Sequence, residues 1–235
     1  MQICHVLGLP RSGTTIFYQC LTRHDKTAYF FSKKFYHLTW LFRPKPLEGY
    51  IWKKLNSELD YRTLAKPFEK SQFLSEVKFY CNKLKSDFFI SKNPDNVLKI
   101  KWLESIHPSK YIVLHREPNA TIRSIYHYAE KNLERDLQNK VSYPGSFKGW
   151  ITILNQFGDG SLSYSAITKY HDFLKKYQIE DARNFPHIDI SYEDFTADPQ
   201  MILNNCFEFL ELPRQKIKLP KVITNMNLKY LQDGI

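Results

Sequence analysis

The sequence predicts an α/β fold of three layers, in which helices cover both faces of a parallel sheet of about four or five strands. Short apolar runs alternate with longer segments of helical periodicity. Two of the helical segments follow their strand directly and open on a polar residue and a proline, at Asn93-Pro94 and at Glu117-Pro118. Strands and helices that alternate in this way are typical of doubly wound sheets. We expect the 235 residues to form a single domain, 1–235.

The first predicted strand leads into a loop that carries two glycines. Residues 3–7 form a short apolar run, followed by Gly8-Leu9-Pro10-Arg11-Ser12-Gly13-Thr14-Thr15 and by a helical pattern that begins near Ile16. A strand, a glycine loop and a helix in this order direct backbone N–H groups and the positive end of the helix dipole towards an anion. The sequence therefore predicts a fold of the P-loop type, with a site for a phosphate-like group.

The charged residues of this loop differ from those of nucleoside triphosphatases. Those proteins place a lysine after the second glycine and hold Mg²⁺ with an aspartate at the end of another strand. Here Thr14 stands in the lysine position, and Arg11 is the one cation of the loop. The later predicted strands end beside cations, at Lys92 and at His115-Arg116. Such a site suits an anion handled without a metal, and a sulfuryl group fits because it carries less charge than a phosphoryl group.

The segment after the first helix is the least regular part of the chain. We expect a second strand over residues 27–32. Residues 33–86, rich in aromatic residues and lysine, then predict a helical insertion beside the sheet, with helices over about 50–65 and 68–85. Since this insertion follows the binding loop, we expect it to form the substrate side of the site.

The rest of the chain alternates between strands and helices. The expected elements are a strand over 87–91, a helix from Asn93 to about Ile106, a strand over 110–114, a long helix from Glu117, a loop-rich segment over 140–162, a helix over about 163–177, a strand over 187–190 and a helix that follows Asp198-Pro199. Residues 213–235 have no clear pattern and are not assigned.

Net charge, cysteine spacing and hydropathy limit the possible partners, metal sites and location of the protein. The formal net charge of +10 indicates an acidic partner, such as a nucleotide or an anionic glycan, and no nucleic-acid-binding module is recognisable. The four cysteines are scattered without CxxC spacing and without clustered histidines, which predicts buried, reduced thiols rather than a zinc site. The first strand begins almost at Met1, and no apolar run is long enough to span a bilayer. We therefore expect a cytoplasmic protein without a transmembrane segment.

Four stretches resemble motifs of the sulfotransferases, in the same order. Pro10-Arg11-Ser12-Gly13-Thr14-Thr15 is similar to their 5′-phosphosulfate loop, in the branch with arginine that includes tyrosylprotein and bacterial carbohydrate-type enzymes. Ser91-Lys92-Asn93-Pro94 resembles their lysine-containing strand end. Arg116-Glu117-Pro118, with Ser124 further on, resembles their 3′-phosphate motif, although Glu117 replaces the usual aspartate. Ser191-Tyr192-Glu193-Asp194 resembles the segment whose tyrosine lies by the adenine.

The resemblance implies 3′-phosphoadenosine 5′-phosphosulfate (PAPS) as the donor, adenosine 3′,5′-bisphosphate (PAP) as the product, and no metal. It implies that the 5′-phosphate binds to the loop residues Arg11, Ser12, Gly13, Thr14 and Thr15. A catalytic role also falls to Arg11 and to Lys92, because their charges would neutralise the charge that develops on the transferring group.

The other donor contacts would come from Arg116, Ser124 and Tyr192. An arginine at the end of a strand and a hydroxyl two turns into the next helix can converge on one phosphate. Arg116 and Ser124 have this spacing, so the resemblance assigns them to the 3′-phosphate, and it assigns Tyr192 to the adenine.

The acceptor is expected to be a hydroxyl, which needs a base that takes its proton. The preferred candidate is Glu48, in Pro46-Leu47-Glu48-Gly49-Tyr50-Ile51-Trp52, a stretch similar to one in some bacterial relatives. His24 and His37 are the alternatives by position. A hydroxyl on a glycan is the first expectation, followed by a small alcohol or phenol and then by a protein tyrosine.

Two other functions are compatible with parts of the sequence. A P-loop kinase or nucleoside triphosphatase would share the glycine loop, although its lysine and its metal carboxylate are not recognisable here. A nucleotide-binding relative without catalysis would share the donor site and lack the base. Binding of ATP·Mg²⁺ would indicate the first, and binding of PAP without turnover would indicate the second.

Overall fold

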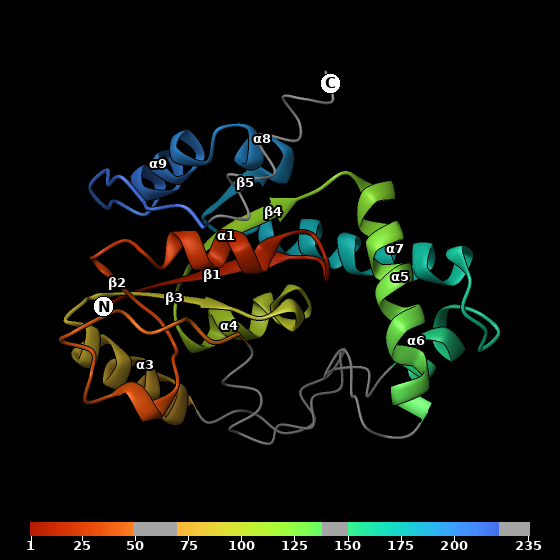
Figure 1. Ribbon diagram of the computed structural model, residues 1–235, viewed down its shortest axis with the longest axis horizontal. Coiled ribbons are helices and arrows are strands. Elements are labelled where there is room, and N and C mark those ends of the chain that lie inside the picture. Colours follow the sequence, from red (N-terminus) through yellow and green to blue (C-terminus); the bar gives the residue numbers. More distant parts are fainter. Residues whose placement is uncertain (49–69, 138–149, 221–235) are drawn as a thin grey trace.

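The structure is a computed structural model that describes residues 1–48, 70–137 and 150–220. Within this part of the chain, five strands form a parallel sheet in the order β2-β3-β1-β4-β5 (Figure 1). The strands are β1 (Gln2–Gly8), β2 (Thr27–Ala28), β3 (Phe88–Lys92), β4 (Lys110–His115) and β5 (His187–Ser191). The predicted α/β class with a parallel sheet of four or five strands is confirmed.

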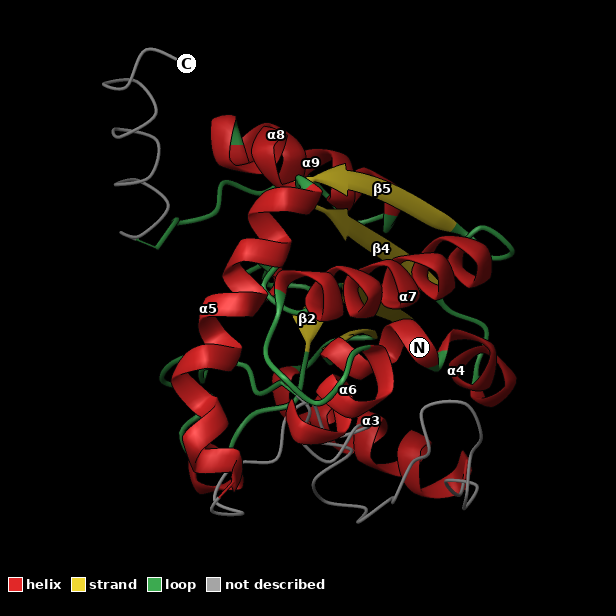
Figure 2. Cartoon of the chain, turned by 90° about the vertical axis from the view of Figure 1, so that its right-hand side faces the viewer, coloured by secondary structure: helices red, strands yellow, loops and turns green. Residues whose placement is uncertain are grey.

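Helices form a layer on each face of the sheet (Figures 1 and 2). The first layer contains α1 (Thr14–Leu21), α8 (Tyr192–Ala197) and α9 (Pro199–Phe209). The second layer contains α5 (Pro118–Leu137), α6 (Trp150–Phe157) and α7 (Tyr164–Ala182), which pack against one another. The helix α5 stands across one end of the sheet in both views. The helix α3 (Lys70–Leu84), predicted over 68–85, packs against β2 and β3.

Side chains of the central strands alternate between the two layers. In β4, Ile112 and Leu114 belong to the apolar cluster that contains residues of α1, α8 and α9, whereas Tyr111 and Val113 belong to the cluster formed with α5, α6 and α7. A strand buried on both faces is apolar at successive positions, as in this run. The periodicity that predicted a buried strand therefore reflects two cores, one on each side of the sheet.

The strand register brings three carboxyl ends together. Gly8 of β1 is paired with Leu114 of β4, and Val6 of β1 is paired with Lys92 of β3. The segments after β1, β3 and β4 therefore leave the sheet close together, at the carboxyl-terminal ends of the strands. In open parallel sheets, ligands bind outside the carboxyl ends of the strands, and the predicted cations lie at or just after the ends of these three strands.

Two predicted elements are wrong in extent. The strand expected over 27–32 contains only Thr27 and Ala28, because the chain then turns to pair with a later segment: Leu47 N donates to Phe30 O at 2.7 Å. The helix expected from Asn93 to Ile106 is divided into the 3₁₀ helix η2 (Pro94–Leu98) and α4 (Ile100–Ile106). The first part is held by short-range bonds such as Lys99 N to Asn96 O, 3.0 Å, which close the tighter 3₁₀ turn.

The segment expected to be loop-rich, 140–162, contains the helix α6. Its apolar residues Trp150, Ile153 and Leu154 are fully buried, so tertiary packing favours a helix there although glycines follow it. The helix expected over about 50–65 falls outside the described residues. A further 3₁₀ turn, η1, covers Lys33–Phe35.

The cysteines are buried and form no disulfide, in agreement with the predicted reduced thiols. Across the described ranges, we find no helix with the length and apolar character needed to cross a membrane.

Candidate functional site

The loop after β1 is a tight turn that depends on its two glycines. A Cβ atom on Gly8 would lie 2.1 Å from Cγ2 of Thr14, and a Cβ atom on Gly13 would lie 2.1 Å from Cε2 of Tyr192. Gly13 also has a φ of 86°, a left-handed conformation that glycine adopts without strain. It occupies the N-cap of α1 without a side-chain hydrogen bond, so the backbone N–H groups at the start of α1 are directed at the space outside the loop.

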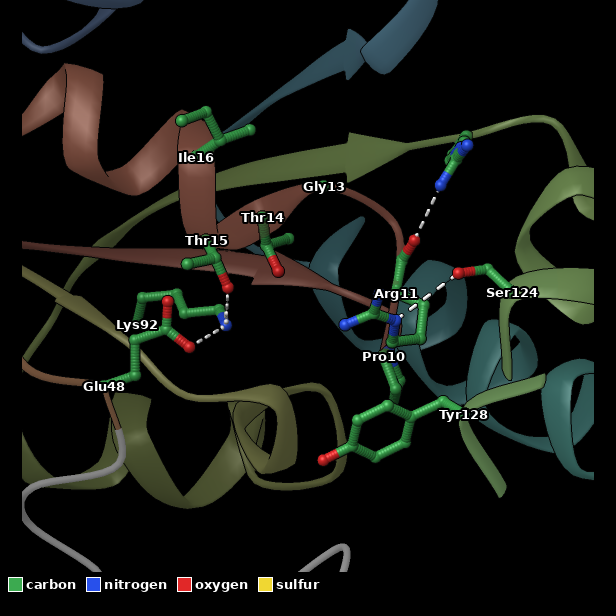
Figure 3. A pocket seen from close by; sticks show the side chains of 11 residues that line it. Pro10, Arg11, Gly13, Thr14, Thr15, Ile16, Glu48, Lys92, Ser124 and Tyr128 are labelled. Atoms are coloured by element: carbon green, nitrogen blue, oxygen red, sulfur yellow. Dashed lines mark hydrogen bonds and ion pairs between the residues drawn. The ribbon is translucent and has the colours of Figure 1, made fainter. Parts of the chain in front are cut away.

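A cavity of about 350 Å³ lies outside this loop (Figure 3). It is lined by Pro10, Arg11, Gly13, Thr14, Thr15, Ile16, Glu48, Lys92, Arg116, Ser124 and Tyr128. The structure therefore brings together eight of the ten residues that the sequence predicts for the site. The two others, Ser12 and Tyr192, lie behind the loop.

Lys92 and Glu48 form an ion pair on one side of the cavity. Lys92 ends β3, and its side chain is only 3% exposed, whereas that of Glu48 is 29% exposed. Lys92 Nζ lies 2.6 Å from Glu48 Oε2 and 3.4 Å from Thr15 Oγ1 (Figure 3). Glu48 Oε1 is buried without a hydrogen-bond partner among the described residues. A base candidate and a cation thus face the same loop.

The charge of Glu48 also affects a tyrosine beneath the cavity. Burial first, and then the negative charge of Glu48, raise the pKa of Tyr18 well above its usual value. The Tyr18 hydroxyl therefore stays protonated, and it donates to Ile90 O at 3.3 Å. Tyr18 is fully buried and does not line the cavity.

Arg11 lies on the other side of the cavity, against α5. Its Nε donates to Ser124 Oγ at 3.4 Å, and its guanidinium carbon lies 5.1 Å from the centre of the Tyr128 ring (Figure 3). Arg116 Nη1 donates to the backbone oxygen of Arg11 at 2.9 Å. The strand end of β4 and the first turns of α5 therefore hold both the backbone and the side chain of Arg11.

The side chains of Ser12 and Tyr192 support the loop. Ser12 is buried, and its Oγ and its backbone N both donate to Leu9 O, at 2.7 and 3.1 Å. Tyr192 begins α8 and packs its ring against Gly13, while the guanidinium of Arg116 lies 5.0 Å from its centre. The Tyr192 ring therefore contacts both the loop and Arg116, and Tyr192 lines neither of the cavities beside the loop.

Glu117 accepts hydrogen bonds from the first turn of α5. Its carboxylate accepts from Asn119 N at 2.8 Å and from Ala120 N at 2.6 Å, and these bonds lower the pKa of Glu117. Glutamate thus caps the helix in place of the aspartate usual in the related motif. Arg116 forms no ion pair with a carboxylate of the described residues, so its charge remains available to a ligand.

A second cavity of about 390 Å³ adjoins the first along α5. It shares Arg11, Arg116, Ser124 and Tyr128 with the first cavity and is further lined by Ala120, Arg123, His127 and Lys131. Five of these eight residues are basic, and none is acidic. This arrangement favours an anion on the α5 side of Arg116.

The alternative base candidates do not lie in the cavity. His24 is buried, its Nε2 is 2.8 Å from Pro213 O, and its Nδ1 accepts from Lys26 N at 3.0 Å. His37 is exposed and lines neither cavity. Among the described residues, no group of histidine, cysteine and carboxylate side chains is arranged to hold a metal ion.

Sequence reasoning missed one cavity residue with a polar aromatic side chain, Tyr128. The signal was present, because Tyr128 follows Ser124 by four residues in a predicted helix and so lies on the same face.

The structure is an α/β protein of the P-loop type, in which Arg11, Lys92 and Arg116 line one cavity outside the glycine loop. Residues 5–216 match the model of the sulfotransferase family. The chain therefore belongs to the sulfotransferase family, and it is a transferase that acts on sulfuryl groups. None of the curated proteins compared with the sequence matches it.

Solved structures of sulfotransferases share this fold. The chain is similar to a sulfotransferase from Alicyclobacillus acidocaldarius, with a TM-score of 0.51 and 13% identity over 99% of this chain and 92% of that chain. The sulfotransferase domain from the curacin biosynthetic pathway gives a TM-score of 0.50 and 18% identity, over 91% and 75% of the two chains. The sulfotransferase domain of the Synechococcus PCC 7002 olefin synthase gives 0.52 and 17%, over 92% and 74%. At these identities the likeness concerns the fold.

Proposed function

We propose that the protein transfers a sulfuryl group from PAPS to a hydroxyl of a glycan or a small alcohol. The observation that carries this proposal is the convergence of Arg11, Arg116 and Ser124 on the mouth of the glycine loop. Arg11 and Arg116 come from the ends of different strands, and neither is neutralised by a carboxylate of the described residues. Two guanidinium groups that lack an ion pair with any described carboxylate, beside a helix N-terminus, suit a ligand with two separate phosphates.

The 5′-phosphate of the donor would bind to the loop. Gly13, the N-cap of α1, and the first helical residues Thr14 and Thr15 line the cavity, so their backbone N–H groups would supply donors without competing charges. Ser12 is left out of this contact, because its backbone N and its hydroxyl are already bonded to Leu9 O.

The 3′-phosphate would bind where the two cavities meet. Arg116 and Ser124 line both cavities, and the second cavity adds Arg123, His127 and Lys131. A 3′-phosphate in this position would be stabilised by several positively charged side chains. The neutral 3′-hydroxyl of ATP would gain little from the same charges. The contact would therefore distinguish PAPS from ATP.

Glu48 would act as the base and Lys92 as a catalytic cation. The acceptor oxygen attacks sulfur while its proton passes to a Glu48 carboxylate oxygen. The new oxygen–sulfur bond forms as the bond from sulfur to the bridging oxygen breaks, and that oxygen leaves with the electron pair as part of PAP. Lys92 and Arg11 neutralise the charge on the sulfuryl and bridging oxygens. For this step the 2.6 Å pair between Lys92 and Glu48 must open, so that each group meets its own substrate.

A thermal-shift titration with PAP tests the donor assignment. At a concentration 100 times its dissociation constant, PAP should add about 2.7 kcal/mol to the free energy of unfolding. ATP·Mg²⁺ and 5′-AMP at the same concentration should produce much smaller shifts. The variant Arg116→Ala should bind PAP at least tenfold more weakly, because it loses a charge-assisted bond to the 3′-phosphate.

The variant Lys175→Ala serves as a control for the loss of a cation on a neighbouring surface that lines neither of the two cavities. It should bind PAP like the unaltered protein. Stabilisation by ATP·Mg²⁺ alone would place the protein with the nucleoside triphosphatases instead. An unchanged affinity of Arg116→Ala for PAP would remove Arg116 from the 3′-phosphate site.

A further inference from the structure

We propose that Tyr128 is a positioning residue for Arg11: its ring holds the guanidinium at the cavity in the orientation that sulfuryl transfer requires. The inference rests on the proposed function and extends it to a residue outside the four motifs.

The backbone of Arg11 is held in an uncommon conformation. Its φ is 67°, in the left-handed region that residues other than glycine seldom adopt. The bond from Arg116 Nη1 to Arg11 O, 2.9 Å, fixes the carbonyl in this conformation. The backbone conformation therefore fixes the position of the Arg11 Cα and Cβ atoms. It does not fix the guanidinium at the end of the long side chain, which other groups must orient.

Two residues of α5 orient the guanidinium. Ser124 and Tyr128 are four residues apart and lie on the same face of the helix. The bond from Arg11 Nε to Ser124 Oγ is 3.4 Å, which is long for an N–H···O hydrogen bond. The guanidinium carbon lies 5.1 Å from the Tyr128 ring centre, within the range of a cation–π contact. The ring is therefore the larger support of the two.

A ring suits this task because it holds a cation without cancelling its charge. Lys92, on the other side of the cavity, is paired with the Glu48 carboxylate at 2.6 Å (Figure 3). Arg11 has no such ion pair within the described part of the chain. A carboxylate in the place of Tyr128 would compete with an incoming sulfonate, whereas an aromatic face leaves the full charge of Arg11 to that group.

The ring of Tyr128 is itself anchored. Its centre lies 6.2 Å from that of the Trp150 ring, which is fully buried in α6, and the Tyr128 side chain is partly buried against the apolar cluster that contains Trp150. The support for Arg11 thus runs from the loop through α5 to the core between α5 and α6. Because the Tyr128 ring has a fixed position, it can hold the Arg11 guanidinium that lies against it.

Two variants test what the Tyr128 side chain contributes. Tyr128→Phe removes the hydroxyl and keeps the ring, and Tyr128→Leu removes the ring and keeps an apolar side chain. The rate of PAPS conversion to PAP, with water or an added phenol as acceptor, should fall about tenfold in Tyr128→Leu, on the scale of a cation–π contact. It should stay within twofold of the unaltered rate in Tyr128→Phe, which keeps the ring. The dissociation constant for PAP should stay within twofold of the unaltered value in Tyr128→Phe. In Tyr128→Leu it should rise by a smaller factor than the rate falls, because PAP keeps the 5′-phosphate beside Arg11 but lacks the sulfonate.

Tyr126→Leu is the matched control. Tyr126 lies on the same helix and stacks on Tyr164 at 4.1 Å, away from both cavities. This variant removes an aromatic contact of α5 and should leave the PAPS rate within twofold. An equal loss of rate in Tyr126→Leu and Tyr128→Leu would reduce Tyr128 to a packing residue and overturn the inference.

A double-mutant cycle tests that Tyr128 acts through Arg11. Arg11→Ala should lower the rate by about 10²–10³, as expected for loss of an electrostatic catalytic group. In the Arg11→Ala background, Tyr128→Leu should change the rate less than twofold, because nothing is left to position. A tenfold loss in both backgrounds would contradict the proposal.

The NMR signal of the Arg11 Nε–H group tests whether the Tyr128 ring lies against Arg11, and it requires no catalytic activity. The signal is assigned by its absence in Arg11→Lys. Its chemical shift should be displaced by the ring current of Tyr128 in the unaltered protein and in Tyr128→Phe. The shift should vanish in Tyr128→Leu. An unshifted signal in the unaltered protein would overturn the inference even in an active enzyme. A shifted signal in a protein that neither binds PAP nor converts PAPS would keep it and overturn the proposed function.

Discussion

The contact between Glu48 and Lys92 is proposed to serve two states of one site. Their 2.6 Å ion pair stabilises a cation whose side chain is 3% exposed, and a buried cation without a partner would be costly. The same pair occupies the carboxylate that is proposed to take the acceptor's proton. Donor binding would supply Lys92 with a new anion, so the base would become available when the sulfonate is in place.

The variant Glu48→Gln tests this role. An amide keeps a hydrogen bond to Lys92 but cannot accept the proton, so we expect sulfuryl transfer to fall by about 10²–10⁴. The dissociation constant for PAP should change less than twofold. Glu130→Gln, an exposed glutamate of α5 that lies near His127, is the control and should retain full activity. A Glu48→Gln enzyme with more than a third of the normal rate would exclude Glu48 as the base.

The site residues differ in how far the sequence could predict them. Arg116 and Ser124 could be placed together because a strand end and a helix period fix their separation. Glu48 could be named only from a similar stretch, since no local rule brings the connection after β2 to the end of β3. Ser12 was assigned to the phosphate, but its donors bond to Leu9 O, and such a turn within the loop depends on backbone angles that residue types do not specify.

At the scale of elements, the glycine loop is the feature most sensitive to substitution. Gly13→Ala would place a methyl group on the ring of Tyr192, which also lies against Arg116. We expect this variant to lose PAP binding by at least tenfold, because both the loop and Arg116 must shift. Isothermal calorimetry with PAP measures the effect.

Gly160→Ala is the matched control for Gly13→Ala. Gly160 has a φ of 92°, close to the 86° of Gly13, but it lies between α6 and α7 and its added Cβ would meet the side chain of Asn155. Both variants should lose about 1 kcal/mol of stability or somewhat more from the left-handed backbone. Only Gly13→Ala should lose PAP affinity, and equal losses in both would contradict the role given to the Tyr192 contact.

Helices and strands were predicted well where local signals and burial agree. Glu117-Pro118 opens α5 because the glutamate carboxylate accepts the first N–H groups and proline needs none. The helix α6 was missed because its only strong signal is the buried Trp150, Ile153 and Leu154, and glycines nearby favour a loop. The strand β2 ends early because Phe30 pairs with Leu47, a contact far along the chain that no local pattern reveals.

At the scale of the whole molecule, stability depends on a histidine in the central strand. His5 is 1% exposed, and its Nδ1 shares a 2.6 Å hydrogen bond with Ser91 Oγ of β3. Burial first, and then the charge of His107, lower the pKa of His5 to about 3. The folded protein therefore holds His5 neutral, whereas the unfolded chain takes up a proton below its ordinary pKa of about 6.5.

The folded state should consequently lose stability as the pH falls. Between about pH 6.5 and pH 3, His5 alone should lower the free energy of unfolding by about 1.4 kcal/mol per pH unit. Urea unfolding at pH 7, 6 and 5 measures the slope, which should be smaller by about this amount in His5→Asn. His127→Asn, on the exposed side of α5, should keep the slope of the unaltered protein. Equal slopes in all three proteins would show that His5 is not the group responsible.

The position of Glu48 has a consequence for how such enzymes diverge. The cations of the first cavity lie at or just after the ends of the three inner strands β3, β1 and β4, whereas Glu48 lies on the connection that leaves the edge strand β2. A connection at the border of a sheet can be lengthened or shortened without rearranging the inner strands. Descendants of one ancestral chain could therefore acquire new acceptors through changes in the connection after β2, while the residues proposed to bind the donor stay the same.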